Sequence, residues 1–174
     1  MAEYIALLRG INVGGHKKLL MKDLRMLVES LGFTGVRTYI QSGNLVFSAE
    51  EGLDHSGLIS EKILEKYGWE VPVLVISPAE VKEILDACPF PTPQKEKSYF
   101  MLLYQPPLTT DIETTLNFVS AGEKFYITSK CVYFYSELPA GKSRLSNNFF
   151  ERKLKVIATT RNFNTLIKLL EMSN

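Results

Sequence analysis

Short apolar runs alternate along the chain with segments in which apolar residues recur every three or four positions. The runs that predict strands in the first half are 4–8, 36–41, 45–47 and 71–76. The residues with helical spacing are Leu20, Leu24, Leu27 and Leu31, followed further on by Ile59, Ile63 and Tyr67. Gly32 and Gly68 follow these two patterns and predict the helix ends. The predicted order is β-α-β-β-α-β, the ferredoxin-like pattern.

A proline-rich segment separates this half from the rest. The sequence Ser77-Pro78-Ala79-Glu80 is a capping box and predicts a short helix that ends before Pro89. Residues 89–97 contain three prolines, which remove backbone donors and restrict their neighbours, so we expect no regular structure there. We interpret this segment as the joint between an N-terminal half, 1–90, and a C-terminal half, 91–174.

The second half repeats the order of the first and then departs from it. A strand at 99–103 is followed by a second predicted capping box, Thr110 to Glu113, and a helix through Val119. The remaining predicted elements are a hairpin of 125–129 with 132–135 and helices over 145–154 and 163–170. Because 156–158 is short, we expect no clean fourth strand. The fold class is α+β, with ferredoxin-like halves of order β-α-β-β-α-β and then β-α-β-β-α-α in one compact chain.

Internal similarity supports a duplication. Aligning 38–50 with 125–137 gives five identities in thirteen positions. The identical pairs are Tyr39/Tyr126, Ile40/Ile127, Ser42/Ser129, Phe47/Phe134 and Glu50/Glu137. With the same element order, these identities predict that a β-α-β-β unit was duplicated.

Charge and hydropathy narrow the class of protein. The 174 residues include 20 Lys and Arg against 19 Asp and Glu, so the net charge is +1, whereas nucleic-acid binders usually carry a basic excess. No apolar run approaches the ~20 residues that span a bilayer. Residues 5–8 are too short for the core of a signal peptide. We expect a cytoplasmic protein without a membrane partner.

The few cysteines and histidines offer little chemistry. Cys88 and Cys131 lie far apart in the sequence, and with only His16 and His55 besides, they match no zinc spacing. We therefore expect no metal and no cofactor, and we interpret both cysteines as small core residues. His55 is expected on the solvated surface. Neither histidine has a sequence-defined nucleophile and carboxylate as partners, so the sequence discloses no reaction.

Two glycine-rich stretches have part of a phosphate-binding pattern. Residues 10–15 carry P-loop glycine spacing, but His16 and Lys17 follow where Lys and Ser or Thr are needed. Gly141-Lys142-Ser143 has the correct ending, yet Ser136 stands where the first glycine belongs and the preceding strand is part of a hairpin. We interpret these glycines as turn residues.

Polar residues concentrate at the ends of the predicted elements. The candidate ligand-binding set is Arg9, Asn12, Gln41, Ser42, Asn44, Lys142, Ser143, Thr160, Arg161 and Asn162. Arg9 and Arg161 are the expected principal cations, because a guanidinium binds phosphate or carboxylate oxygens in pairs. Asn162 with Thr165 predicts an N-cap, and a helix start presents N–H groups to an anion. The set predicts one shared anion site.

The same segments resemble the motifs of a bacterial family known as domain of unknown function 1697. The matching stretches are Ala6–Gly15 (ALLRGINVGG), Val36–Asn44 (VRTYIQSGN), Lys142-Ser143 with Asn147-Asn148, and Ala158–Asn162 (ATTRN) with Asn164-Thr165. Phe163 stands where the family more often has Trp, which keeps an aromatic residue. The resemblance implies a two-part α+β protein with ferredoxin-like halves, and it implies no activity, so no catalytic residue follows from it.

Three functions remain open from the sequence. The first is binding of, or catalysis on, a small anionic ligand resembling phosphate or a nucleotide in a polar site between the halves. The second is an RNA- or DNA-binding module in which Tyr126, Tyr133 and Tyr135 stack bases, which the net charge disfavours. The third is a structural or interaction protein without a ligand. The ligand's identity, the existence of a reaction and the oligomeric state are left open.

Overall fold

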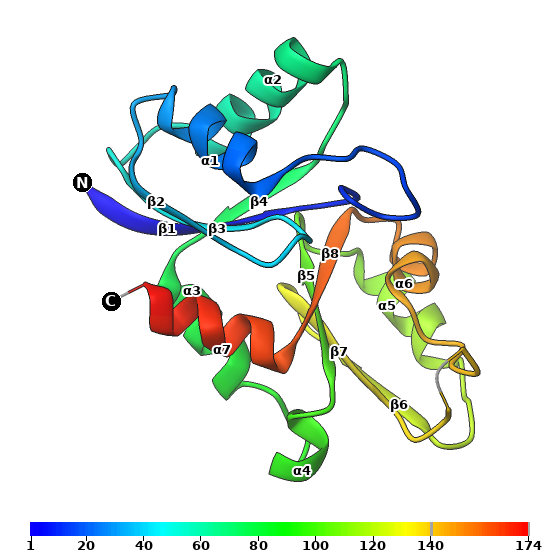
Figure 1. The fold of residues 1–174 in the computed structure, drawn as a ribbon. Helices are drawn as coiled ribbons and strands as arrows, with labels where there is room; N and C mark the ends of the chain where they lie inside the picture. Colours follow the sequence, from blue (N-terminus) through cyan, green and yellow to red (C-terminus); the bar gives the residue numbers. More distant parts are fainter. Residues whose placement is uncertain (140, 174) are drawn as a thin grey trace. The chain divides into compact units, whose positions relative to one another are not determined.

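The computed structural model describes residues 1–139 and 141–173, which fall into two compact units (Figure 1). The first unit comprises Met1–Lys82 together with the segment from Ile167 onward, and the second comprises Glu83–Leu166. The division into halves 1–90 and 91–174 remains a prediction.

Each unit contains one four-stranded sheet with helices, which confirms the α+β class (Figure 1). The strands are β1 (Ala2–Leu8), β2 (Thr34–Tyr39), β3 (Asn44–Ala49), β4 (Val73–Ile76), β5 (Tyr99–Leu103), β6 (Glu123–Ile127), β7 (Cys131–Ser136) and β8 (Ala158–Asn162). The helices are α1 (Met21–Glu29), α2 (His55–Tyr67), α3 (Pro78–Asp86), α4 (Thr92–Lys95), α5 (Thr109–Leu116), α6 (Asn147–Leu154) and α7 (Phe163–Met172).

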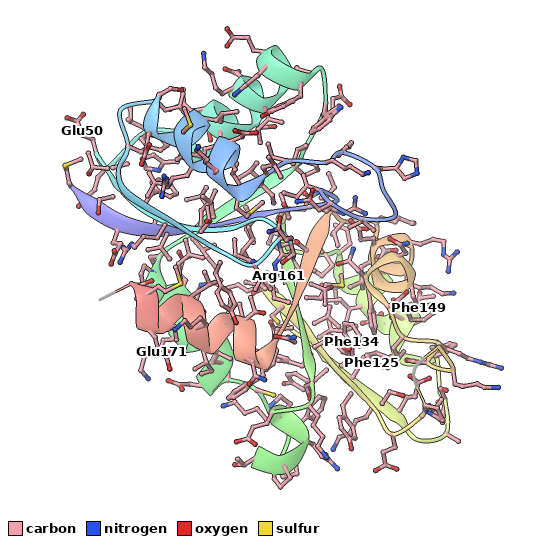
Figure 2. The ribbon with its side chains drawn as sticks, viewed as in Figure 1. Glu50, Phe125, Phe134, Phe149, Arg161 and Glu171 are labelled. Carbon is pink, nitrogen blue, oxygen red and sulfur yellow. The ribbon has the colours of Figure 1, made fainter. Side chains whose placement is uncertain are left out.

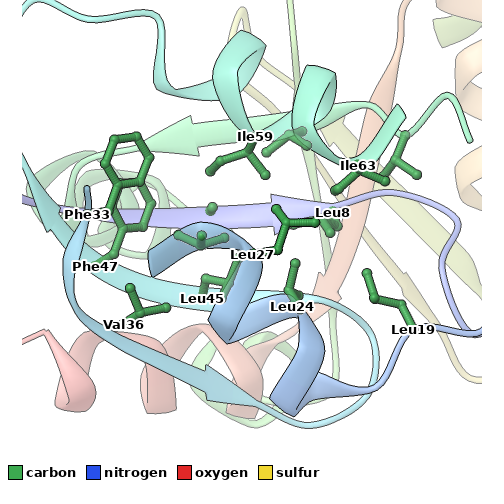
Figure 3. Packing of buried hydrophobic residues seen from close by; sticks show 14 of the residues in the cluster. Leu8, Leu19, Leu24, Leu27, Phe33, Val36, Leu45, Phe47, Ile59 and Ile63 are labelled. Atoms are coloured by element: carbon green, nitrogen blue, oxygen red, sulfur yellow. The ribbon is translucent and has the colours of Figure 1, made fainter. Parts of the chain in front are cut away.

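The sheet of the first unit has the order β2-β3-β1-β4, and all its pairs are antiparallel. This is the predicted ferredoxin-like arrangement. One face of the sheet carries α1 and α2, whose apolar sides point toward it (Figure 3). Leu24 and Leu27 from α1 and Ile59 and Ile63 from α2 are buried there, as their helical spacing predicted. Phe33 stacks on Phe47 at the edge of this core, with ring centroids 4.9 Å apart.

The second sheet has the order β6-β7-β5-β8, again antiparallel, with α5 and α6 covering one face. The sequence prediction was wrong about its fourth strand, so the order of the second half is not β-α-β-β-α-α. Residues 158–162, predicted as part of the segment before the last helix, form β8 and pair with β5 from Leu103↔Ala158 to Tyr99↔Asn162. Ladder hydrogen bonds come from the backbone, so this polar strand needs few apolar side chains.

Two helix starts differ in how well they were predicted. The Ser77–Glu80 capping box is confirmed, since Ser77 N–H donates to the Glu80 carboxylate at 2.8 Å and Glu80 N–H donates to Ser77 Oγ at 3.1 Å. The second box is wrong. Helix α5 has Leu108 at its N-cap with no side-chain bond, which leaves Thr110 inside the helix, and it ends at Leu116, before the exposed Val119.

The proline-rich segment is more regular than predicted. Helix α4 occupies Thr92–Lys95, within the 89–97 segment in which no regular structure was expected. Pro93 lies in the first turn, where a missing N–H breaks no helical hydrogen bond. The Pro91 carbonyl accepts from the N–H groups of Gln94 and Lys95 at 2.9 Å each.

The two hairpins correspond, although their turns differ in length. Tyr39 pairs with Asn44 across a turn of residues 40–43, whereas Thr128 N–H bonds Cys131 O across a turn of 129 and 130. The sequence alignment therefore matches β3 to β7 correctly, including Phe47 with Phe134, but runs two positions out of register on β2 and β6. Three of the five identities, those at Tyr39, Ile40 and Ser42, are not structurally equivalent.

Candidate functional site

Five of the predicted site residues lie at one end of the first sheet. Arg9 and Asn12 follow β1, and Gln41, Ser42 and Asn44 belong to the β2–β3 turn. Leu8 N–H donates to Gly43 O at 2.9 Å, which joins the end of β1 to this turn. The sequence therefore predicted correctly that these segments are neighbours.

Asn12 and Asn44 hold these loops in place. The Asn12 side chain donates to Leu19 O at 2.9 Å and to Gln41 O at 2.7 Å, and it accepts from Leu19 N–H at 2.8 Å. Asn44 is fully buried, and its amide donates to Tyr39 O at 2.9 Å and Ser42 Oγ at 2.8 Å. Both amides are used in closing turns, which is a structural role.

The other five predicted residues lie in the second unit. Lys142 and Ser143 belong to the loop between β7 and α6, and Lys142 is exposed. Ser143 O–H donates to the Glu123 carboxylate, which also accepts from Ser120 O–H at 2.9 Å and from Arg144 N–H at 3.0 Å. These hydrogen bonds outweigh the partial burial of Glu123 and lower its pKa below the ordinary value.

Successive residues of β8 point to opposite faces of the second sheet, which separates residues that are adjacent in the sequence. Thr160 is opposite Met101 and donates its hydroxyl to Asn147 Oδ1 at 2.7 Å, on the side of α6. Arg161 is opposite Phe100 and donates to Thr159 Oγ1 at 2.7 Å (Figure 2). Thr160 and Arg161 therefore do not serve one site on this sheet.

Arg161 is only 9% exposed. Burial lowers the pKa of its guanidinium to about 10, with an opposing effect from Tyr104. The side chain also donates to Thr160 O at 2.9 Å, so part of its hydrogen-bonding fork is used within its own strand. Asn162 is the predicted N-cap of α7, since its Oδ1 accepts from Thr165 N–H at 2.9 Å.

A cavity of about 610 Å³ opens on the α6 side of the second sheet. It is lined by Lys97, Tyr99, Phe134, Ser136, Leu138, Pro139, Gly141, Ser143, Leu145, Ser146, Asn147 and Thr160. Its volume is in the range of ~300–1,000 Å³ that small-molecule sites occupy. The lining combines one lysine, an aromatic wall and several hydroxyl groups.

Two of the predicted residues, Ser143 and Thr160, line this cavity, and Lys142 lies in the loop that borders it. Arg161 and Asn162 are not among its lining residues. The expectation that Arg9 and Arg161 share one anion joins residues of different units and remains a prediction.

Sequence reasoning missed several residues of the cavity, namely Lys97, Tyr99, Phe134, Ser146 and Asn147. Tyr99 could have been noticed because it is the first residue of a predicted strand. In the structure it is 49% exposed, whereas the rest of that strand is buried. Ser146 could have been found as an N-cap, because its hydroxyl oxygen accepts from Phe149 N–H at 3.1 Å.

His55 is a correction to the sequence analysis. It begins α2 and is 6% exposed, with its Nε2 atom 2.8 Å from Glu50 O. Its ring lies 4.4 Å from that of Tyr4 and 6.0 Å from that of Phe47. The surrounding glycines and polar residues suggested a surface loop, but the imidazole packs in an aromatic cluster.

Tyr133 is another correction, since the sequence suggested it as a surface residue for stacking bases. It is 1% exposed, and its hydroxyl donates to Ile84 O at 2.6 Å. Burial raises its pKa. Tyr126, on the neighbouring strand, is half-exposed.

The two cysteines are not activated thiols. Cys131 is buried in β7, which confirms its interpretation as a core residue, and burial raises its pKa. Cys88 is partly buried, and desolvation raises its pKa as well. Both thiols stay protonated at neutral pH, whereas a nucleophilic cysteine needs a lowered pKa.

Residues 1–139 and 141–173 contain no group of three His, Cys, Asp or Glu side chains placed to hold a metal ion. Within the same ranges, no helix has the length and apolar character needed to cross a membrane.

Comparisons with known proteins give a family and a fold. A family model described as "Protein of unknown function (DUF1697)" matches residues 1–133. The solved structure of conserved bacterial protein SP0830 from Streptococcus pneumoniae superimposes with a TM-score of 0.75 at 24% identity, covering 99% of this chain and 98% of that one. At this identity the match shows a shared fold alone. No curated protein matches the chain.

Proposed function

The chain belongs to the DUF1697 family of proteins of unknown function, and from the geometry of its own residues we propose that it binds a small phosphate-like anion in the cavity of the second unit. The observation that carries this proposal is the composition of the cavity wall. A lysine and six hydroxyl or amide side chains line it, and none of its described lining residues is an aspartate or glutamate.

Lys97 supplies the positive charge. It is exposed, lies between α4 and β5, and no described carboxylate lies within ion-pair distance of its ammonium group. An ammonium group without an internal partner can attract an anionic ligand without first breaking an ion pair. Lys142 is also exposed in the β7–α6 loop and adds a second positive charge near the rim.

The hydroxyl groups supply hydrogen bonds. Ser146 Oγ accepts from Phe149 N–H at 3.1 Å, so its own O–H can donate to a ligand oxygen. Asn147 accepts from Thr160 O–H and donates to Glu151 Oε1 at 2.9 Å, which fixes the orientation of its amide. One N–H of that amide remains for a ligand, since an asparagine side chain has two.

Glu123 limits where the anion can lie. Its carboxylate accepts the Ser143 hydroxyl, and a negative charge there opposes a second one nearby. We therefore place the anionic group toward Lys97 and Ser146, away from Ser143.

The test is a thermal-shift measurement with phosphate and sulfate, using chloride at matched ionic strength as the reference. A ligand that binds only the folded protein raises its stability by mass action. We expect phosphate to raise the melting temperature by a few degrees at saturation, since ~1 kcal/mol shifts a chain of this size by about 2–4 °C.

The informative variant is Lys97→Gln, with Lys130→Gln as its matched control. Lys130 lies in the β6–β7 turn, at the other end of β7 from Ser136, and its ammonium group makes a long ion pair of 3.9 Å with Glu83. We expect Lys97→Gln to lose the phosphate-induced shift and Lys130→Gln to keep it. Equal behaviour of the two variants, or no shift with any anion, would exclude the proposed site.

A further inference from the structure

The duplicated sheets allow one unit to be compared with the other, position by position. Tyr4 is opposite Phe47 in the first sheet, and Tyr99 is opposite Phe134 in the second. Each pair links the two central strands of its sheet, β3 with β1 and β7 with β5. In both pairs the phenylalanine belongs to the core under the helices. Tyr4 with Phe47 therefore corresponds to Tyr99 with Phe134.

In the first unit an imidazole ring fills the space over this pair. The His55 ring lies 4.4 Å from the Tyr4 ring and 5.5 Å from that of Phe33, and His55 is almost fully buried. Its position is set by α2, in which His55, Ile59 and Ile63 are buried at intervals of four residues.

In the second unit the corresponding helix position carries a small side chain. Phe150 and Leu154 of α6 are buried four residues apart, as Ile59 and Ile63 are, and Ser146, the N-cap of α6, precedes Phe150 by the same four residues that separate His55 from Ile59. The loop that precedes this helix is also twice as long, 137–146 against 50–54.

The space that the imidazole occupies in one unit is open in the other. Tyr99 and Phe134 stack with ring centroids 5.3 Å apart and planes inclined by 25°. Tyr99 is nevertheless 49% exposed, and Tyr99, Phe134 and Ser146 together line the cavity. Figure 2 shows Phe134 close to Phe125, on the side of the sheet where Phe149 of α6 lies.

We propose that the ligand of this cavity carries a planar aromatic ring that stacks on Tyr99, in the place that His55 takes in the first unit. This inference rests on the proposed anion-binding function and names its ligand class: a phosphate-bearing compound with an aromatic or heteroaromatic ring, as in a nucleoside monophosphate. The ring contacts Tyr99, Leu138 and Leu145, and the phosphate points toward Lys97.

The test compares adenosine 5′-monophosphate with ribose 5-phosphate, which has the same sugar phosphate without the base. Stacking of one base on an aromatic side chain contributes roughly a 10-fold to 100-fold gain in affinity. We expect calorimetric titration of the unmodified protein to show adenosine monophosphate binding at least about 10-fold more tightly.

Four variants test whether the gain in affinity comes from stacking on Tyr99. We expect Tyr99→Ala to bind adenosine monophosphate no more tightly than ribose 5-phosphate. Tyr99→Phe should keep the tighter binding of adenosine monophosphate, because it keeps an aromatic ring. Tyr126→Ala is the control, since Tyr126 is equally exposed but does not line the cavity. Ser146→His, which puts an imidazole at the start of α6 as in the first unit, is expected to block the nucleotide.

The outcomes separate the two proposals. If both sugar phosphates bind with equal affinity, or if Tyr99→Ala keeps the preference in a folded protein, the aromatic ligand class is wrong and the anion site stands. If neither compound nor inorganic phosphate binds, both proposals are wrong. The comparison of the two ligands needs no variant, so a folding defect in Tyr99→Ala does not remove the test.

Discussion

Gly43 shows how one residue joins the end of β1 to the first hairpin. Its φ is +86°, and a Cβ atom at this position would lie 2.8 Å from Leu8 Cβ and from Ile11 Cδ1. Both neighbours are almost fully buried. Glycine is therefore required here for its backbone conformation and for the close approach of the β1 end.

We expect Gly43→Ala to lower the free energy of unfolding by about 2–4 kcal/mol, from overpacking together with left-handed backbone strain. Gly52→Ala is the matched control, because Gly52 has φ +83° but nothing within 4 Å of its Cβ position. That variant should lose only about 1 kcal/mol. Urea unfolding followed by the fluorescence of Trp69, which packs on the first core, measures both. Equal losses would contradict the close packing at Gly43.

Glu123 makes stability depend on pH. Hydrogen bonds lower its pKa in the folded state, so it contributes stability above its unfolded pKa and loses that contribution as pH falls through the lowered folded pKa. We expect Glu123→Gln to be less stable than the unmodified protein at neutral pH, by under ~1 kcal/mol because the carboxylate is largely solvated.

The difference in the free energy of unfolding between Glu123→Gln and the unmodified protein should disappear as pH falls below the ordinary pKa range of glutamate. Glu137→Gln is the control and should show no such pH dependence, because Glu137 is exposed. Urea titrations over a pH series give both curves. A Glu123→Gln deficit that persists unchanged in acid would argue against the hydrogen-bonded carboxylate.

At the level of elements, the two predicted capping boxes should respond differently to an alanine substitution. Ser77 bonds the N–H of Glu80, so Ser77→Ala should cost about 1 kcal/mol. Thr110 lies inside α5, where alanine is the better helix former, so Thr110→Ala should be neutral or slightly stabilising. Thermal unfolding followed by circular dichroism distinguishes them. A loss at Thr110 as large as that at Ser77 would mean that the sequence-based cap was right after all.

The elements that sequence reasoning missed are those whose signals depend on tertiary context. Strand β8 contains Thr159, Thr160 and Arg161, whose polar side chains suggest a loop, yet the backbone pairs with β5 and the side chains bond α6 or one another. His55 looked like a surface residue among polar neighbours, but aromatic rings from β1 and β3 enclose it. The apolar helices and strands were predictable because their periodicity follows directly from burial.

For the molecule as a whole, the same sheet order occurs twice, and the two copies differ at the helix that follows the third strand of each unit. The two units share strand order and aromatic pairs, whereas the helix start that carries His55 in one unit carries Ser146, an N-cap, in the other. Of the residues that the sequence placed in one candidate set, Ser143 and Thr160 line the cavity, while Asn12 and Asn44 close turns. Sequence alone marks polar residues at element ends, but it does not separate turn-closing amides from side chains that line a cavity.

The most direct test of the proposed ligand site is to map the bound anion on the isotope-labelled protein by nuclear magnetic resonance, with adenosine 5′-monophosphate as the probe. The account predicts that saturable shifts of backbone amides concentrate at Lys97, Tyr99, Ser146, Asn147 and Thr160. Shifts that instead concentrate around Arg9, Asn12 and Ser42 in the first unit, or that fail to saturate, would contradict it.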